Sequence, residues 1–306
     1  MDKKISKVGM GMCYCNTEIM DYAYSHNIKM IDLGYGYQGE NVAEKQVGEW
    51  IKDKNREEFV IIDKLPLFDG LYTKKFKKSV YSMKPEELEC AVYALIREQL
   101  EYTNAKYFDV YMLHALFDMQ FTENYNIEDD LKLYKKLVPI LLKLKKEGLI
   151  KEIGFSCHIT YERLCMFLNE VDPDNKVFTV AEVSYNVLND KGYDNFKPST
   201  FSKLHNVRVW NAIGEKGIHY LKEKGYTIID MMPHESGRLL QVSTAPDYIR
   251  WNDTFINNSP DIDYILVGTT YDKHIDDMLI ACGEMEDDKP VPDMRIINSG
   301  IGHCHE

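Results

Sequence analysis

Short apolar runs alternate with longer amphipathic segments along almost the whole chain. The runs are bounded by polar residues, as is typical of strands that helices cover on both faces. They predict eight strands, at residues 7–12, 30–32, 59–64, 107–114, 151–156, 178–186, 226–232 and 262–267.

The segments between these runs carry apolar residues at helical spacing. Residues 41–53, for example, place Ala43, Val47 and Ile51 on one helical face. Further helices are predicted at residues 17–25, from 85 onward, at 128–147, at 161–171, at least once within 201–225, and at 273–285.

Local signals define several helix ends. Asn16 or Thr17 can cap the first helix, and the residues between 64 and 85 indicate a long polar loop. Pro139 should kink or split the helix in which it lies, because it lacks the N–H for the helical hydrogen bond. Gly148 follows that helix at the position where a left-handed residue commonly ends it.

Eight strands that alternate with helices favour a closed parallel (β/α)8 TIM barrel of the α/β class. An open dinucleotide-binding sheet would need three glycines after its first strand, and Gly9 and Gly11 supply only two. No linker interrupts the pattern, so we expect one barrel domain over residues 1–285. Residues 286–306 are proline-broken and aperiodic, and we expect them to form a tail.

Composition narrows the classes of function. The chain has 306 residues, is 44% hydrophobic and carries a net charge of −12, which argues against a nucleic-acid surface. No apolar run is long enough to span a membrane, and the N-terminus leads into no apolar signal core. We therefore expect a cytoplasmic protein, whose oligomeric state the pattern leaves open.

The seven cysteines form no CxxC pair and are typical of reduced thiols. Cys13 and Cys15 indicate packed thiols, with metal binding or oxidation sensing as the alternative. The ending His303-Cys304-His305 holds one cysteine, too few for an iron–sulfur cluster. The sequence therefore predicts no dedicated metal site.

Polar residues of different chemistry follow three neighbouring strands. Asp32, Lys64 and His114 end the second, third and fourth strands, and Tyr37 lies in the glycine-rich loop after Asp32. A (β/α)8 barrel collects its active-site groups at the carboxyl ends of its strands. These four side chains should therefore meet at one mouth.

Their chemistry indicates proton donation to a carbonyl oxygen. A tyrosine is a weak acid, but a neighbouring ammonium lowers its pKa, so Lys64 could assist Tyr37 while Asp32 holds Lys64. His114 could orient the carbonyl. No side chain delivers hydride, so a nicotinamide cofactor is implied. Taken singly, a solvated lysine, a packed tyrosine and a core histidine are the more ordinary interpretations.

The order of these motifs resembles the aldo-keto reductase family over roughly residues 5 to 285. The resemblance continues in residues 148–156, in Val183-Ser184-Tyr185-Asn186 and in Val267-Gly268-Thr269-Thr270 followed by His274. It is strongest to a bacterial branch that often ends in a ferredoxin-like cysteine cluster, which is absent here. It implies a (β/α)8 barrel, with Tyr37 as general acid, Lys64 as its pKa partner, Asp32 as anchor and His114 as carbonyl orienter.

The resemblance also implies NADPH as cofactor, with NADH as the alternative. The cofactor-binding positions it implies are Gly11, Met12, Ser156, Cys157, Glu182, Met231, Pro233, Gly237, Leu239, Gly268, Thr269, Thr270, Lys273, His274 and Asp277. Three of them depart from the family pattern: Cys157 replaces an asparagine, Glu182 replaces a glutamine, and Met231, or else its neighbour Met232, replaces an aromatic residue. Lys273 and His274 could meet a 2′-phosphate, although the usual arginine is missing.

The favoured hypothesis is an NAD(P)H-dependent oxidoreductase that reduces a small aldehyde or ketone or oxidises the alcohol. Ionisable residues near the predicted mouth, such as His158 and Arg238, favour a polar substrate. Two alternatives stay open. One is a dinucleotide-binding regulatory barrel with little turnover, and the other is a redox-neutral lyase or epimerase that uses Tyr37 and Lys64 for proton transfer.

Overall fold

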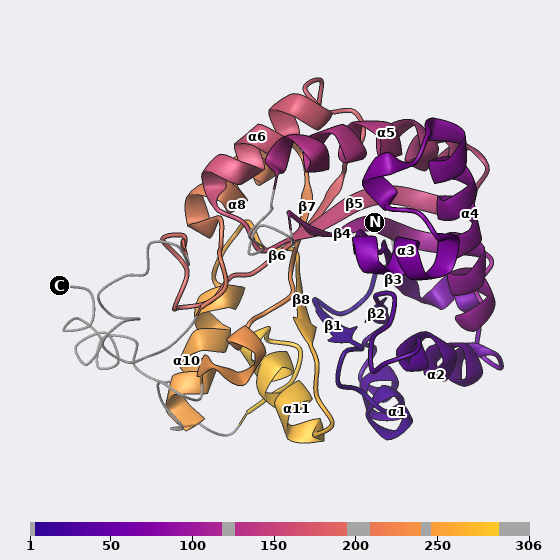
Figure 1. The fold of residues 1–306 in the computed structure, drawn as a ribbon. Helices are drawn as coiled ribbons and strands as arrows, with labels where there is room; N and C mark the ends of the chain where they lie inside the picture. The colour runs from indigo at the N-terminus through magenta and orange to yellow at the C-terminus, as the bar shows by residue number, and fades with distance from the viewer. Residues whose placement is uncertain (1–3, 118–125, 195–208, 240–245, 288–306) are drawn as a thin grey trace.

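The fold is a closed barrel of eight parallel strands in chain order (Figure 1), given by a computed structural model that describes residues 4–117, 126–194, 209–239 and 246–287. The (β/α)8 prediction is confirmed. The strands are β1 (Val8–Gly11), β2 (Met30–Asp32), β3 (Val60–Leu65), β4 (Phe108–Leu116), β5 (Ile150–Cys157), β6 (Val180–Val183), β7 (Thr227–Asp230) and β8 (Tyr264–Val267).

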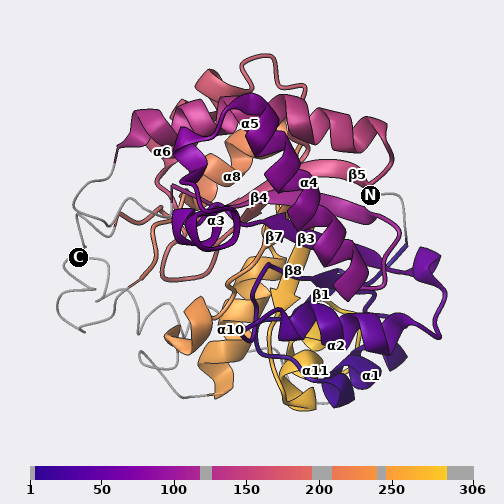
Figure 2. The ribbon, with the colours of Figure 1, turned by 45° about the vertical axis from the view of Figure 1, so that its right-hand side comes forward.

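Helices surround the barrel on its outer side, as Figures 1 and 2 show. The described helices are α1 (Thr17–Ser25), α2 (Val42–Ile51), α3 (Asp69–Phe76), α4 (Pro85–Tyr102), α5 (Ile127–Lys146), α6 (Tyr161–Val171), α8 (Gly214–Glu223), α10 (Pro246–Asn257) and α11 (Asp272–Ala281). Within the described part of the chain, none of them combines the length and the apolarity that crossing a bilayer requires.

The barrel interior holds an apolar core drawn from most of its strands. Its members are Met30, Val60, Ile62, Val110, Met112, Val180, Ile229 and Leu266. Glycines make room for them: a Cβ on Gly9 would lie 2.9 Å from Leu266, and one on Gly154 would lie 3.0 Å from Met112. Because side chains alternate along a strand, the residue two positions after each core residue also faces inward.

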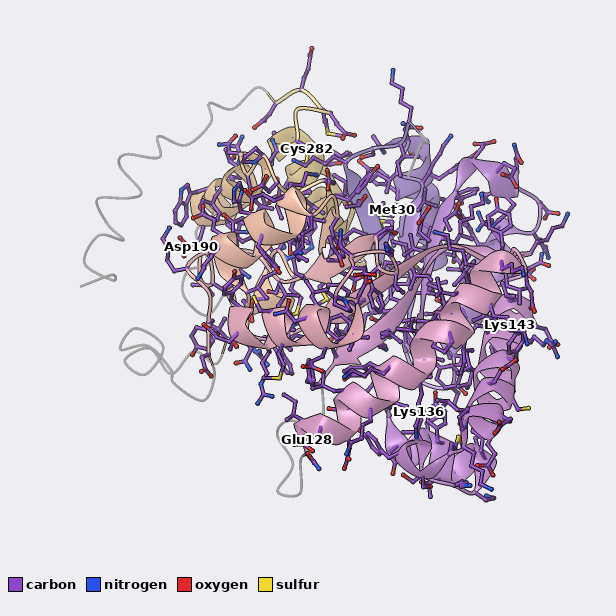
Figure 3. The ribbon with its side chains drawn as sticks, turned by 90° about the horizontal axis from the view of Figure 1, so that it is seen from above. Met30, Glu128, Lys136, Lys143, Asp190 and Cys282 are labelled. Atoms are coloured by element: carbon purple, nitrogen blue, oxygen red, sulfur yellow. The ribbon has the colours of Figure 1, made fainter. Side chains whose placement is uncertain are left out.

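A second, larger core lies between the sheet and the helices. Helix α5 shows how the sequence builds it: Leu133, Leu137, Ile140 and Leu144 recur at helical spacing and are buried. Figure 3 shows the same helix running along the outside of the sheet, marked by Glu128, Lys136 and Lys143. Burial of this apolar stripe stabilises the helix against the barrel.

Three details of the predicted elements need correction. Pro139 does not split α5, which is one helix from Ile127 to Lys146 with Pro139 on its exposed face. Residues 69–76 form α3 within the stretch predicted as a loop, and α10 was not predicted. Helix α3 was missed because its polar sequence has little apolar periodicity, whereas α10 has a clear apolar face that was overlooked. Several strands are also shorter than predicted, with β6 ending at Val183.

Other local predictions are confirmed. Asn16 caps α1, its side-chain oxygen accepting a hydrogen bond from the Ile19 N–H at 3.0 Å. Gly148 follows α5 with a φ of +78°, the left-handed conformation expected there. The predicted boundary at residue 285 stays a prediction, because most of the proposed tail, including residues 303–305, lies outside the described residues.

Candidate active site

A layer of polar side chains lies directly above the apolar core of the barrel. Asp32, Lys64, His114 and Glu182 each stand two residues after an inward-facing core residue of β2, β3, β4 and β6. Alternation along the strands therefore turns all four side chains inward at the carboxyl end of the barrel. With Tyr37 they form what we call the mouth group.

Lys64 lies at the centre of this group and is fully buried. Its Nζ makes a short ion pair with Asp32 Oδ1, donates to the Leu33 carbonyl at 2.8 Å, and lies 3.3 Å from Glu182 Oε1. Burial lowers the Lys64 pKa, but Asp32 and Glu182 outweigh that effect and leave it well above the ordinary value. Lys64 is therefore an ammonium at neutral pH.

The loop after β2 places Tyr37 beside Lys64. The Tyr37 N–H donates to the Gly34 carbonyl at 3.0 Å, and the ring packs so closely on Gly34 that a Cβ there would lie 2.6 Å from it. Lys64 Nζ is 5.4 Å from the centre of the Tyr37 ring. Gln38 fixes the loop, because its Nε2 donates to the carbonyls of Met12 and Cys15, each at 2.8 Å.

His114 faces Tyr37 edge to face, with 5.8 Å between ring centres. Burial, Lys64 and His158 lower the pKa of His114 to about 3, so its imidazole is neutral at physiological pH. Its Nδ1 is buried without a hydrogen-bond partner among the described residues. The next residue, Ala115, has a φ of +52°, a backbone strain of the kind that is held at functional sites.

The pKa of Tyr37 corrects one expectation. Burial raises it well above the ordinary value, the Lys64 ammonium opposes the rise, and Asp32 and Glu182 add to it. The net shift in the Tyr37 pKa is upward, opposite to the direction expected from Lys64 alone, chiefly because the phenol is buried, with the two carboxyl groups opposing the single ammonium. Tyr37 is therefore a protonated phenol that can donate its proton.

The expected cofactor positions on β1, β5, β7 and β8 also lie around the mouth. Gly11 and Gly268 bring β1 and β8 together, and a Cβ on Gly268 would lie 3.1 Å from the Gly11 carbonyl oxygen. Ser156 is buried and accepts a hydrogen bond from the Ala115 N–H at 2.9 Å. Met231 packs at the edge of the inner core. Gly11 and Gly268 thus let the backbones of β1 and β8 approach each other closely on this side of the mouth.

Two expected positions contribute mainly to packing. Cys157 and Met12 belong to the outer core that the sheet shares with the helices, not to the inner layer. Burial, followed by Glu182, raises the pKa of the Cys157 thiol. The structure therefore does not bring Cys157 into the mouth group, whereas it does bring in Glu182.

The segment after β7 holds Pro233, Gly237 and Leu239. Pro233 and Leu239 are buried and Gly237 is exposed, with a φ of +80°. Glu235 anchors the segment: it is fully buried and accepts from the Trp210 N–H at 2.7 Å and from Asn186 Nδ2 at 2.8 Å. These contacts hold an irregular backbone in one place.

Beyond β8, Thr270, Lys273 and His274 are exposed at the start of α11, and Asp277 is half-buried one turn later. Thr269 is buried, and its Oγ1 lies 2.8 Å from His274 Nδ1. The exposed Lys273 and His274 side chains can donate hydrogen bonds close to the N-terminus of α11, an arrangement suited to an anion.

Sequence reasoning missed Gln38 and Glu235 as residues that hold the site. Gln38 is one residue after Tyr37, and a polar residue with φ of +59° in a glycine-rich loop is a signal of a fixed turn. Glu235 lies in the short helical turn after β7. Its anchoring role depends on Trp210 and Asn186, which lie far from it in sequence, so no local pattern could indicate it.

Cys13 is exposed and Cys15 is buried, with Cys15 Sγ 3.1 Å from the Gly11 carbonyl oxygen. Asp32 and Lys64 both influence the Cys13 thiol, whose pKa burial raises, so Cys13 lies near the mouth group. No group of three or more potential ligands that could hold a metal ion is found in the described ranges.

Comparison with known proteins agrees with this geometry. The model of the aldo/keto reductase family matches residues 16–257. A barrel with this polar mouth defines an oxidoreductase of the NAD(P)-dependent class. The chain belongs to the aldo/keto reductase family, as its sequence motifs indicated. A comparison with curated proteins finds no match.

Several solved structures share the fold at low sequence identity. An aldo-keto reductase from Klebsiella pneumoniae in complex with NADPH is 14% identical, with 98% of this chain and 91% of that chain covered and a TM-score of 0.66. The holo form of one from Bacillus halodurans is also 14% identical, with 99% and 93% covered and a TM-score of 0.63. The aldose reductase from Schistosoma japonicum is 17% identical, with 97% and 88% covered and a TM-score of 0.56.

Proposed function

We propose that this protein reduces a small, polar aldehyde or ketone with NADPH, or oxidises the corresponding alcohol. The observation that carries the proposal is the inward-facing mouth group, in which a protonated Tyr37 phenol lies beside the Lys64 ammonium and a neutral His114. A phenol and a neutral imidazole next to each other can both donate a hydrogen bond to a carbonyl oxygen.

The residues present fit a nicotinamide dinucleotide. Glu182 Oε2 is buried and has no hydrogen-bond partner in the described structure, so it can accept from a carboxamide N–H. Gly11 and Gly268 carry no side chains where β1 and β8 meet, and the exposed Lys273 and His274 side chains can donate hydrogen bonds to a phosphate. When bound, the nicotinamide supplies hydride to the carbonyl carbon.

The chain's own residues supply the proton. Tyr37 donates its phenolic proton to the carbonyl oxygen, and Lys64 stabilises the resulting phenolate. Asp32 holds Lys64 in place through their ion pair. His114 orients the carbonyl by donating a hydrogen bond from an imidazole nitrogen. In alcohol oxidation the same groups act in reverse, with Tyr37 as the phenolate that accepts the proton.

A polar substrate is supported by the residues around the rim. His158 packs against Trp210 with ring centres 5.0 Å apart, and the Arg238 guanidinium lies 5.2 Å from the Trp210 ring. A guanidinium and an indole next to each other bind polar and anionic groups well.

A fluorescence titration with NADPH and NADH tests the cofactor. Saturable binding is expected, and a Lys273→Ala/His274→Ala variant should weaken NADPH binding about tenfold more than NADH binding, because only NADPH carries the 2′-phosphate. Lys216→Ala/His219→Ala, an exposed pair on α8, serves as the matched control. Absence of binding of either nucleotide would contradict the proposal.

Assays with a panel of aldehydes and ketones then distinguish the reductase from the regulatory barrel and the redox-neutral enzyme. Consumption of NADPH with an aldehyde or ketone supports the reductase. Binding without turnover on any carbonyl would point to the regulatory barrel. Chemistry on a substrate without added nucleotide would point to the redox-neutral enzyme.

A further inference from the structure

Two carboxyl groups share one ammonium inside the barrel. Lys64 Nζ makes its closer contact with Asp32, and Glu182 Oε1 lies 3.3 Å away on its other side. All three side chains are buried, with exposed fractions of 0% for Lys64, 4% for Asp32 and 1% for Glu182. Three strands, β2, β3 and β6, thus bring one positive and two potentially negative groups into the buried interior of the barrel.

The single Lys64 ammonium can neutralise only one of these two carboxyl groups. A buried charge without a partner is costly, and carboxyl groups that share a site do not both ionise at neutral pH. Asp32 and Glu182 both contact the single Lys64 ammonium in the buried interior, so one of the two carboxyl groups must keep a proton. Asp32 has the closer ion pair with Lys64, so the proton belongs to Glu182.

We propose that Glu182 is a positioning residue of the mouth group, which shares one proton with Asp32 and thereby sets how much positive charge Lys64 presents to Tyr37. The inference rests on the proposed function for its relevance to catalysis. The glutamine expected at this position could not play this part, because an amide does not ionise.

The surrounding groups agree with this assignment. Burial and the adjacent Asp32 carboxylate raise the pKa of Glu182 well above its ordinary value, while Lys64 opposes the rise. The titratable groups that face Glu182 inside the barrel are Asp32, Lys64 and Tyr37, and Cys157 in the outer core is close enough to feel its charge. When Glu182 keeps its proton, only Asp32 offsets the Lys64 charge. When Glu182 ionises, its charge opposes ionisation of Tyr37.

Infrared spectroscopy of the protein without nucleotide tests the shared proton. The carbonyl stretch of a protonated carboxyl group should be lost in Glu182→Gln relative to wild type. It should also be lost in Asp32→Asn, because Glu182 then becomes the only carboxylate partner of Lys64 and gives up its proton. Persistence of the same band in Glu182→Gln would overturn the proposal, as would its persistence in Asp32→Asn.

Glu44→Gln provides the matched control. Glu44 is equally buried, on α2, and its pKa is raised to about 7 by burial, but it makes no ion pair or hydrogen bond with Lys64 in the described structure. This variant should keep the band assigned to Glu182. Thermal melting of each variant checks that the barrel remains folded.

A titration of the Tyr37 phenol tests the consequence. Its absorbance change, isolated by subtracting a Tyr37→Phe background, should occur about one pH unit lower in Glu182→Gln than in wild type, because the ionised carboxylate is gone. An unchanged or higher midpoint would overturn the proposed link. Both measurements use the protein without nucleotide or substrate, so they remain informative even if no carbonyl is reduced.

If the protein does reduce carbonyls, the basic limb of its kcat/KM profile should shift by the same amount. A merely structural role for Glu182 would lower the melting temperature without moving that limb. A role limited to holding the nicotinamide would raise the dissociation constant for NADPH without moving it. Either of these results would overturn the proposal.

Discussion

The two ends of the barrel use carboxylates in opposite ways. At the amino ends of the strands, Asp109 accepts from Arg56 Nη2 at 2.8 Å and from the Ile61 N–H at 3.0 Å. At the carboxyl ends, Asp32 and Glu182 share one lysine, and Glu182 Oε2 is left without a hydrogen-bond partner among the described residues. The carboxylate at the amino ends is paired and hydrogen-bonded, whereas the carboxyl ends hold more buried carboxyl groups than ammonium groups. Such an excess of buried carboxyl groups is costly unless it serves function.

Other carboxylates at the amino ends follow the same rule. Asp172 accepts three backbone N–H groups just before β6, and Asp263 pairs with Lys222 and accepts from the Ile228 N–H at 2.8 Å. These groups hold the strand entrances together. In this (β/α)8 barrel, residues that stabilise the fold lie at the amino ends of the strands and residues for chemistry at the carboxyl ends. Substitutions at the two ends should therefore affect stability and activity differently.

Among substitutions that leave the mouth-group side chains themselves unchanged, the largest effect should come from Gly34→Ala. The new Cβ would lie 2.6 Å from the Tyr37 ring and would push the phenol out of place. We expect kcat/KM for carbonyl reduction to fall about 100-fold, because small misplacements of a catalytic group are costly. NADPH binding and the melting temperature should change little. Gly70→Ala in α3 is the control, since its Cβ meets nothing.

Asp109→Asn at the opposite end should affect stability instead. The substitution removes the charge that pairs with Arg56, whose side chain is 15% exposed. We expect unfolding in denaturant to become easier by about 2 kcal/mol, because a largely buried charge loses its partner. The folded variant should retain its kcat/KM. A loss of activity without a loss of stability would contradict a purely structural role for Asp109 at the amino ends of the strands.

The pH dependence of the unfolding free energy should reveal how Asp230, at the carboxyl end of β7, ionises. Burial raises the pKa of Asp230 to about 8, although it accepts from the N–H groups of Tyr185 and Met232. The folded state therefore binds a proton that the unfolded chain has already lost. This group's contribution to stability is present at low pH and is lost as pH rises to about 8.

Over that range one such group costs about 1.4 kcal/mol of stability per pH unit. Asp230→Asn keeps both hydrogen bonds but cannot ionise, so it should flatten the fall in unfolding free energy between about pH 6 and pH 8. Chemical unfolding at several pH values provides the measurement. An equal slope in the variant and the wild type would show that Asp230 ionises normally in the folded protein.

The smallest effect should come from Gly148→Ala beyond α5. Gly148 has a φ of +78°, and no atom lies within 4 Å of the position of a new Cβ. The cost is therefore only that of a side chain in the left-handed conformation, about 1 kcal/mol of unfolding free energy. Thermal unfolding should reveal it with activity unchanged. A larger loss would mean that this end of the barrel carries strain of its own.

The sequence allowed the fold and four members of the mouth group to be predicted, because both depend on local periodicity. A strand turns every second side chain inward, so Asp32, Lys64 and His114 could be placed from the residues that precede them. The glycine-rich loop likewise indicated Tyr37. The closed barrel and the inward placement of these groups in the structure agree with that reasoning.

What could not be predicted depends on contacts across the barrel. Glu182 was expected to address the cofactor, but its contact with Lys64 arises only when β6 and β3 face each other in the closed barrel. The raised pKa of Tyr37 follows first from burial and then from the two carboxyl groups, and could not be inferred from Lys64 alone. Helix α3 was missed because its polar sequence has little apolar periodicity.

The most direct test of the central claim is the rate of NADPH-dependent carbonyl reduction by Tyr37→Phe and by Tyr111→Phe. Tyr111 is a fully buried phenol on the outer side of β4, where its hydroxyl donates to Gln99 Oε1 at 2.6 Å. We predict that Tyr37→Phe binds NADPH normally but loses about 1,000-fold in kcat/KM, as expected for a general acid. Tyr111→Phe should keep the wild-type rate. Carbonyl reduction by Tyr37→Phe at the wild-type rate would contradict the account.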